Sequence, residues 1–285
     1  MRPAPERAAN TLAALLASCA LLTGCAAPPG PSPAGPSLSG LSVPADPAAA
    51  LPLAAYRHDL AGLRLVESAR DTLAAECMTR LGHPGWTPPP LPTARPWDSG
   101  MSIGLLDADH AAAHGYRAPA DTRNTEAPTP DGQRLAYLGP LPGEPPAPGI
   151  PYGGCAAEAD QAFGPPPDLS LVASLTAAAE DAVATDPRAV ESLGEWSTCM
   201  SEKGHEYELP GEAQYQYWPR TVTDVERALA TADVACKTRS RLGEVWFELL
   251  SGYQAELADD NADALKSVAD ALAAERARAR DVVTP

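Results

Sequence analysis

Two segments of the chain repeat one pattern around a cysteine, and this repeat constrains the fold more than any other feature. The segment CMTRLGHPGWTP begins at Cys77, and CMSEKGHEYELP begins at Cys199. In both, a Met follows the Cys, a Gly-His pair comes a few residues later, and a Pro closes the segment. A Gly in this place takes the left-handed backbone conformation that ends a helix. The pattern therefore predicts two helices, each carrying a Cys about one turn before its end.

The spacing of the cysteines predicts disulfides. Beyond the N-terminal region the chain contains Cys77, Cys155, Cys199 and Cys236. An even number of cysteines outside the cytoplasm is typical of disulfides, and four allow three pairings. Because each repeated segment is followed by one further Cys, we expect Cys77 to pair with Cys155 and Cys199 with Cys236. Each bridge should stabilise the fold by about 3 to 5 kcal/mol through closure of its loop.

Two other uses of these cysteines compete with disulfides. Cys77 and Cys199 could join His83 and His205 in a zinc site, but no Cys has a second one within four residues, and extracellular thiols oxidise. A catalytic thiol at Cys155 would need a nearby His, and the nearest upstream is His114. We therefore expect neither a metal nor a cofactor at the cysteines.

The first 24 residues have the pattern of an export signal. Arg2 and Arg7 precede the apolar stretch TLAALLASCALL, which is too short to span a bilayer stably. The tetrapeptide LTGC, ending at Cys25, is similar to the lipobox of bacterial lipoproteins, which implies a lipid on Cys25 and cleavage before it. An ordinary secretory signal or an uncleaved anchor would be the alternatives. We expect Cys25 to hold the mature chain on the outer face of the plasma membrane.

The composition of residues 25–52 predicts a tether. Pro, Gly, Ser and Ala with almost no charge cannot bury a core, so this segment should be a semi-rigid spacer. In polyproline geometry, at about 3.1 Å per residue, it would reach on the order of 80 Å. The predicted organisation is a signal peptide (1–24), a lipidated Cys with its tether (25–52) and a disulfide-stapled helical domain (53–285).

The periodicity of apolar residues predicts a mainly α fold. Helices are expected over residues 54–81, 168–184, 186–204 and 223–282, and no run of alternating β-branched residues suggests a strand. Between the first two lies a Pro-rich excursion, residues 83–166, interrupted by short helices near 107–114 and 155–163. The last region should be a long helix or a helical hairpin. It either packs on a partner helix or projects to recruit an envelope protein.

The charge of the chain excludes one class of partner. The formal net charge is -16, from 21 Lys and Arg against 37 Asp and Glu. Such a field repels nucleic acid and anionic lipid surfaces. We therefore expect no nucleic acid partner, and contact with the membrane only through the lipid on Cys25.

Two side-chain clusters are candidate ligand sites. Carboxylates flank a group of aromatic residues, an arrangement that can stack on sugars or hold cations, or that can fold its rings onto the helices. The aromatic residues are Tyr207, Tyr215, Tyr217 and Trp218, and the carboxylates are Glu206, Glu208 and Glu212. In the second cluster, His110 and His114 are four residues apart and would share one helix face, as metal ligands or as a solvated surface.

No sequence motif indicates an enzyme. We find no Ser-x-x-Lys, no His-x-His pair and no Gly-rich phosphate loop. We therefore expect no catalytic residue, with an unrecognised cell-wall hydrolase as the remaining enzymatic alternative.

A resemblance to known proteins rests on the two repeated segments and on two further stretches, GGCAAEA and ADVACKTRSRLGEVWFELLSGYQ. Over roughly residues 55–282 the chain resembles a group of uncharacterised actinobacterial secreted and lipid-anchored proteins that share Cys-Met-x-x-x-Gly segments, DVACK and a long C-terminal helix. No activity is assigned to that group, so no functional residue is carried over. Some members are encoded near ABC-class export systems, which implies an accessory role at the cell envelope. The alternative is a lipoprotein that binds a wall fragment, a metal or a small cation.

Overall fold

The computed structural model describes residues 35–38, 40–88, 90–91, 99–117, 131–145, 147–219 and 221–284. All of them belong to one compact unit that begins at Gly35. The export signal and the lipobox at Cys25 lie outside the described residues. Within the described ranges every regular element is a helix, so the mainly α fold is confirmed.

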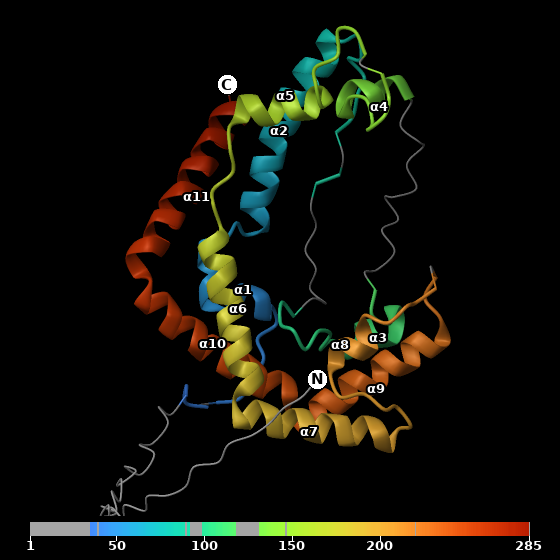
Figure 1. The fold of residues 1–285 in the computed structure, drawn as a ribbon, viewed down its shortest axis with the longest axis vertical. Coiled ribbons are helices and arrows are strands. Elements are labelled where there is room, and N and C mark those ends of the chain that lie inside the picture. Colours follow the sequence, from blue (N-terminus) through green and yellow to red (C-terminus); the bar gives the residue numbers. More distant parts are fainter. Residues whose placement is uncertain are drawn as a thin grey trace, which may run out of the picture. The chain divides into compact units, whose positions relative to one another are not determined.

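The helices follow the expected order, with shorter elements added at the N-terminus and in the loops (Figure 1). They are α1 (Pro47–Ala50), the 3-10 helix η1 (Pro52–Tyr56), α2 (Leu60–Arg80), α3 (Ala108–His114), α4 (Asp131–Leu138), α5 (Gly154–Phe163), α6 (Ser170–Thr185), α7 (Pro187–Glu202), α8 (Pro210–Gln214), α9 (Asp224–Ser240), α10 (Leu242–Asp260) and α11 (Ala262–Val283).

The two repeated segments form the same helix ending. In α2 the N–H of His83 donates to the carbonyl of Met78 at 2.8 Å, and in α7 the N–H of His205 donates to that of Met200 at 2.9 Å. Gly82 and Gly204 lie between them with φ of 87° and 83°. This pair of hydrogen bonds satisfies carbonyls that the last helical turn would otherwise leave unpaired.

The expected disulfides are confirmed. Cys77 in α2 is bonded to Cys155 in α5, and Cys199 in α7 is bonded to Cys236 in α9, with a Cα–Cα distance of 5.5 Å in each. All four are buried. A zinc site that uses Cys77 and Cys199 is therefore excluded, as is a free catalytic thiol at Cys155.

The helices pack in groups around separate apolar clusters. Figure 1 shows α2 beside α5 and α11, and α7 beside α9. The largest cluster is formed by residues of α6, α7, α9 and α10, together with the segment that leads into α3. Leu53 of η1 belongs to a second cluster with Leu265 and Leu272 of α11. The apolar stripe of α11 therefore contacts the rest of the chain rather than solvent.

The predicted C-terminal helical region is divided into three helices. Between α9 and α10 the chain turns at Arg241, which has a φ of 57°, and between α10 and α11 it turns at Asn261. Asn261 lies in the segment ADDNADA, where Asp and Asn compete with helical hydrogen bonds. No sequence signal marks the first turn, because Arg rarely takes the left-handed conformation.

The structure corrects the predicted tether. Residues 35–52, which were expected to be a spacer, belong to the packed unit. We call residues 35–38 and 40–56 the strap. Leu51 and Leu53 of the strap are buried, the carbonyl of Pro36 accepts from Arg188 Nη1 at 2.6 Å, and the N–H of Leu53 donates to Gln254 Oε1 at 3.1 Å. A few Leu residues suffice to dock a segment whose average composition is typical of a linker.

Candidate functional site

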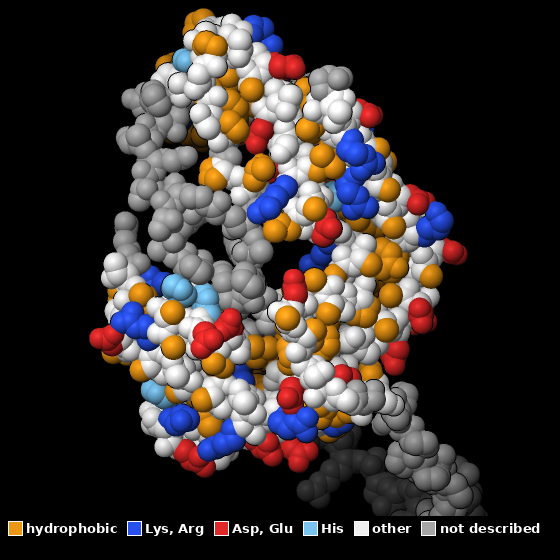
Figure 2. Space-filling view, turned by 180° about the vertical axis from the view of Figure 1, so that it is seen from behind, with side chains coloured by type: hydrophobic (Ala, Val, Ile, Leu, Met, Phe, Trp, Pro, Cys, Tyr) orange, Lys and Arg blue, Asp and Glu red, His pale blue; other side chains and the backbone are white. Residues whose placement is uncertain are grey.

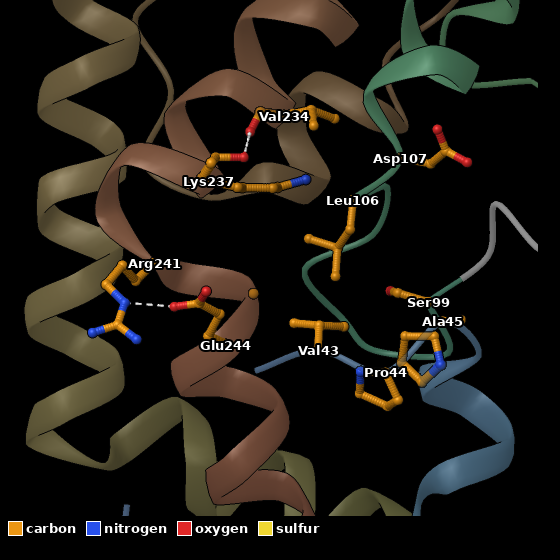
Figure 3. A pocket seen from close by; sticks show the side chains of 13 residues that line it. Val43, Pro44, Ala45, Ser99, Leu106, Asp107, Val234, Lys237, Arg241 and Glu244 are labelled. Carbon is orange, nitrogen blue, oxygen red and sulfur yellow. Dashed lines mark hydrogen bonds and ion pairs between the residues drawn. The ribbon is translucent and has the colours of Figure 1, made fainter. Parts of the chain in front are cut away.

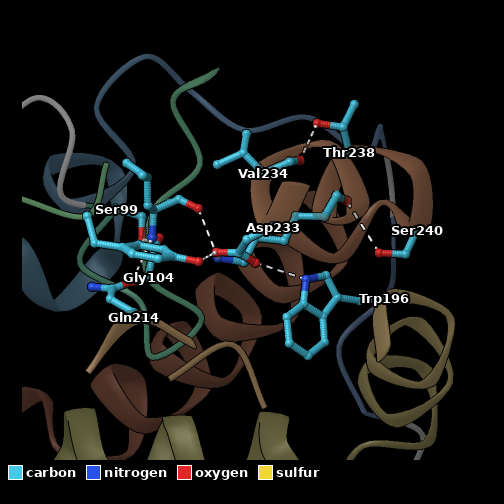
Figure 4. Close-up of polar contacts among 11 residues, drawn as sticks. Ser99, Gly104, Trp196, Gln214, Asp233, Val234, Thr238 and Ser240 are labelled. Atoms are coloured by element: carbon cyan, nitrogen blue, oxygen red, sulfur yellow. Dashed lines mark hydrogen bonds and ion pairs between the residues drawn. The ribbon is translucent and has the colours of Figure 1, made fainter. Parts of the chain in front are cut away.

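The segment ADVACK, residues 232–237, contains a buried ion pair. Asp233 and Lys237 are one turn apart on α9, and Lys237 Nζ lies 2.8 Å from Asp233 Oδ2. Their side chains are 0% and 1% exposed. Trp196 Nε1 donates to Asp233 Oδ1 at 2.9 Å, and the hydroxyl of Tyr116 donates to Oδ2 at 3.3 Å (Figure 4). Lys237 Nζ also donates to the carbonyl of Leu105 at 3.0 Å.

Burial dominates the electrostatics of this pair. It raises the pKa of Asp233 and lowers the pKa of Lys237, while the attraction between the two groups opposes both shifts. Burial also raises the pKa of Tyr116, and the Asp233 carboxylate raises it further. The phenol is therefore a donor throughout the physiological range. Charges buried this deeply require partners, and the network supplies them from several elements.

The network joins segments that are distant in sequence. Trp196 comes from α7, Tyr116 from the turn after α3, and Leu105 from the segment that leads into α3. The Cys199–Cys236 bridge links α7 to α9 within the same apolar cluster. The network therefore fixes part of the Pro-rich excursion onto the C-terminal helices.

A pocket of about 360 Å³ lies beside this network (Figure 3). One wall is formed by the strap, through Val43 and Pro44, and another by Leu106. Lys237 and Glu244 line the wall formed by α9 and α10. The volume falls within the usual range for small-ligand pockets, and both apolar and polar groups face it.

The charged groups at the pocket already have partners. Lys237 is held by Asp233, and Arg241 Nε lies 2.5 Å from Glu244 Oε2. Asp107 Oδ1 accepts from the N–H of His110 at 2.9 Å and so caps α3. The pocket therefore combines opposite charges and does not select a ligand by charge alone.

The aromatic cluster predicted as a ligand site divides into two pairs. Tyr207 and Trp218 are half-buried against the largest apolar cluster, and Trp218 lies with its ring centroid 6.1 Å from that of Tyr116. Tyr215 and Tyr217 point outward, with 76% and 93% of their surfaces exposed. Packing thus accounts for one pair and leaves the other on the surface.

The two histidines predicted as weak metal candidates do lie together. The rings of His110 and His114 are 5.0 Å apart between centroids. His110 is buried, its Nε2 lies 2.6 Å from the carbonyl of Arg117, and burial lowers its pKa. In the part of the chain that the structure describes, no third His, Cys, Asp or Glu completes a metal site.

Sequence reasoning missed the residues that make the buried polar contacts. The spacing of Asp233 and Lys237 is that of an ordinary surface pair, and only burial distinguishes it. Thr223 and Glu226 have the spacing of a capping box, in which the Glu side chain would accept from the N–H of Thr223. Instead the buried Glu226 carboxylate accepts from Arg117 Nε at 2.9 Å, and only the Thr223 half of the box forms. An Asp or Glu with a cation one turn away, inside an apolar stripe, is the signal that would have indicated a buried pair.

Comparison of the chain with protein-family models, with curated proteins and with solved structures gives no match. None of the helices in the described ranges has the length and apolar character of a membrane span. The class that fold and site define is a mainly α-helical domain stapled by two buried disulfides, with a polar network and a small pocket between its C-terminal helices and its N-terminal strap.

Proposed function

We propose that the protein is a lipid-anchored, extracytoplasmic accessory protein that binds a component of the cell envelope and does not catalyse a reaction. The observation that carries this proposal is the pair of buried disulfides, because such bridges persist in oxidising compartments and are rare in the cytosol. The lipobox-like segment ending at Cys25 supplies the attachment to the membrane.

The anchor is tested by membrane fractionation and mass spectrometry of the natural protein. The mature N-terminus should be Cys25 carrying a diacylglyceryl group, and Cys25→Ala should release the protein from the membrane fraction or block its processing. A chain that begins elsewhere and carries no lipid would contradict the proposal. Cys19→Ala is the matched control, because Cys19 lies within the predicted signal and should leave the modification unchanged.

The compartment is tested through the redox state of the cysteines. Alkylation of intact cells before reduction should leave Cys77, Cys155, Cys199 and Cys236 unmodified. Free thiols at these positions in freshly alkylated cells would place the protein in a reducing compartment and would contradict the proposed location.

The C-terminal helix stays a candidate contact for an envelope protein, with one restriction. Its apolar stripe packs inside the molecule, so a partner would meet the outward face, which carries Lys266 and Asp270. Substitutions on this face are the appropriate test by co-purification from membranes. Unchanged partners in Lys266→Ala and Asp270→Ala chains would rule out this helix as the contact.

The pocket beside Lys237 favours a second candidate, a lipoprotein that binds a wall fragment, a metal or a small cation. The test is thermal stability in the presence of soluble wall digests, divalent cations and small amines, with Val43→Trp as a variant that fills the pocket. A ligand of the pocket should raise the melting temperature of the natural chain and leave that of Val43→Trp unchanged. No shift with any of these probes would contradict this candidate.

A further inference from the structure

The segment from residue 205 to residue 219, here called the Tyr-rich loop, exposes both aromatic rings and carboxylates. Tyr215 and Tyr217 are among the most exposed large side chains of the described residues, and Leu209 is 53% exposed. Glu206 and Glu208 are exposed on the same loop. Large side chains with rigid rings are frequent anchors of protein interfaces. The loop therefore has the composition of a contact surface.

Hydrogen bonds hold the loop in one conformation. Glu212 Oε2 accepts from the backbone N–H groups of Glu208 and Leu209, at 2.8 and 3.0 Å. Gln216 Nε2 donates to the hydroxyl of Tyr207 at 3.3 Å, so the beginning and the end of the loop lie side by side. The exposed rings thus project from an ordered backbone, and a partner would meet a surface that needs little ordering.

The backbone of the loop is also tied to α7, through the hydrogen bond from Ser197 Oγ to the carbonyl of Tyr207 at 2.7 Å. Cys199 follows Ser197 by two residues on α7, and its disulfide with Cys236 fixes α7 to α9. The surface is therefore mounted on a helix that a disulfide fixes to α9.

The charge of the loop indicates the chemistry of its partner. Residues 205–219 include three Glu and neither Lys nor Arg, within a chain of net charge -16. Among the described residues, no hydrogen bond or ion pair engages the Glu208 carboxylate, while Glu206 accepts only from Ser201 Oγ, at 2.9 Å. Guanidinium and ammonium groups can pair with such carboxylates and stack on Tyr faces at the same time. A neutral sugar would desolvate these carboxylates without offering a charge in return.

We propose that the Tyr-rich loop is a docking surface for a segment of a partner protein that carries Lys and Arg side chains. The proposal deepens the binding role proposed above and rests on it, but it does not require the lipid anchor. The acidic field of the whole chain would speed the encounter with a basic segment, and the exposed rings would hold it.

The test is fluorescence anisotropy with the full-length protein in detergent. The probes are three labelled octapeptides of one design, in which half of the positions carry Lys and Arg, Glu, or Ser. The basic peptide should bind at least tenfold more tightly than the other two, and its affinity should fall as NaCl rises from about 0.05 to about 0.5 M. Equal binding of the three peptides, or no binding, would overturn the proposal.

Matched variants separate the loop from the field of the whole protein. Tyr217→Ser and Glu208→Gln should each weaken binding of the basic peptide by about fivefold or more, because each removes a direct contact. The controls are Tyr152→Ser, whose ring is 99% exposed outside the loop, and Glu256→Gln on α10, and both should stay within about twofold of the natural chain. If the two control variants lose as much affinity as the two loop variants, binding is not confined to the loop and the proposal is wrong.

A competition experiment tests whether the Tyr-rich loop prefers a ligand other than a basic peptide. A soluble wall digest or CaCl2 that displaces the peptide at matched ionic strength would show that the loop prefers a glycan or a metal cation, and would overturn the assignment to a basic protein segment. A chain found without lipid would contradict the anchor alone, because the readout is made in solution.

Discussion

At the scale of single residues, the chain contains two Asp–Lys pairs of similar local geometry in opposite environments. Asp233 and Lys237 are fully buried, whereas Lys266 and Asp270 on α11 are 72% and 67% exposed. Both pairs are spaced by one helical turn and have short contacts. They therefore separate the effect of burial from that of charge pairing.

Replacing Lys237 by Met should lower the free energy of unfolding by about 3 to 5 kcal/mol, because it leaves the Asp233 carboxylate buried without its cation. Lys266→Met should change it by no more than about 0.5 kcal/mol. Urea denaturation measures both. Adding Asp233→Asn to Lys237→Met should recover part of the loss, and a double variant that is as unstable as the sum of the two single ones would contradict the account.

A second residue, Asp71 on α2, predicts how stability depends on pH. Burial, and secondly the nearby Glu67, raise its pKa from 3.8 to about 6. The folded state therefore binds this proton more tightly than the unfolded state does. The contribution of Asp71 favours folding below about pH 4 and is lost as the pH rises through about 6.

Asp71→Asn should accordingly raise the free energy of unfolding near pH 7.5 by about 1 kcal/mol, a value reduced for the partial exposure of the group. Near pH 4 the gain should vanish. Denaturation at the two pH values measures the difference. Glu76→Gln, an exposed position on the same helix, is the control, and an equal gain in that variant would attribute the effect to net charge.

At the scale of elements, α7 and the turn that ends it contain two glycines, and only one of them has a backbone conformation that favours Gly over Ala. Gly194 lies inside the helix with open space where the methyl group of an Ala would lie, whereas Gly204 follows the helix with a φ of 83°. Neither site has an atom that would clash with a Cβ, so backbone conformation alone separates them.

Gly204→Ala should destabilise the protein by about 1 kcal/mol, because Ala is strained in the left-handed conformation. Gly194→Ala should stabilise it by about 0.5 to 1 kcal/mol, because Ala loses less backbone freedom within a helix. Thermal denaturation of the two variants shows whether each substitution raises or lowers the stability of the protein. Shifts of the same sign would show that the ending of α7 is not held by its Gly.

The sequence predicted the helices and their endings wherever these depend on residues that are close together in the chain. Gly82, Gly204 and the order of the four cysteines were sufficient for two helix ends and both disulfides. The break at Arg241 was not predicted, because a left-handed Arg is imposed by packing on both sides and not by its own preference. The packed strap was missed for a related reason, since the position of a few Leu residues outweighs the average composition around them.

The candidate sites were less predictable than the fold. The pattern of four aromatic residues was visible, but nothing in it distinguished Tyr207 and Trp218, which pack, from Tyr215 and Tyr217, which do not. The pocket was not visible at all, because its walls come from the strap, from the segment before α3 and from α9 and α10. Sites assembled from distant segments need tertiary structure before they can be recognised.

At the scale of the whole molecule, α11 is part of the fold and not an appendage. Its residues Leu265, Val268 and Leu272 are buried in a cluster with η1 and α6, and the helix also lies against α2. The surface charges are mixed as well: Figure 2 shows Lys and Arg interspersed with Asp and Glu on the face drawn.

A chain that ends at Asp260 should therefore lose cooperative unfolding and become sensitive to protease in α2 and α6, because removal of α11 exposes the apolar faces it covers. Limited proteolysis and circular dichroism measure this. Lys266→Ala with Asp270→Ala, on the outward face of α11, is the control and should unfold as the natural chain does. A truncated chain that is equally resistant would show that α11 folds independently.

The docked strap also determines how far the protein can travel. Cys25 and Gly35, where the packed unit begins, are ten residues apart, and a fully extended chain of that length spans at most about 35 Å. A lipid on Cys25 would then confine the domain to a thin layer above the headgroups instead of letting it sample the depth of a wall. Confinement to such a layer raises the local concentration of the domain around any neighbour anchored in the same membrane. If Cys25 carries the proposed lipid, this confinement favours contacts on the cell that are too weak to survive purification.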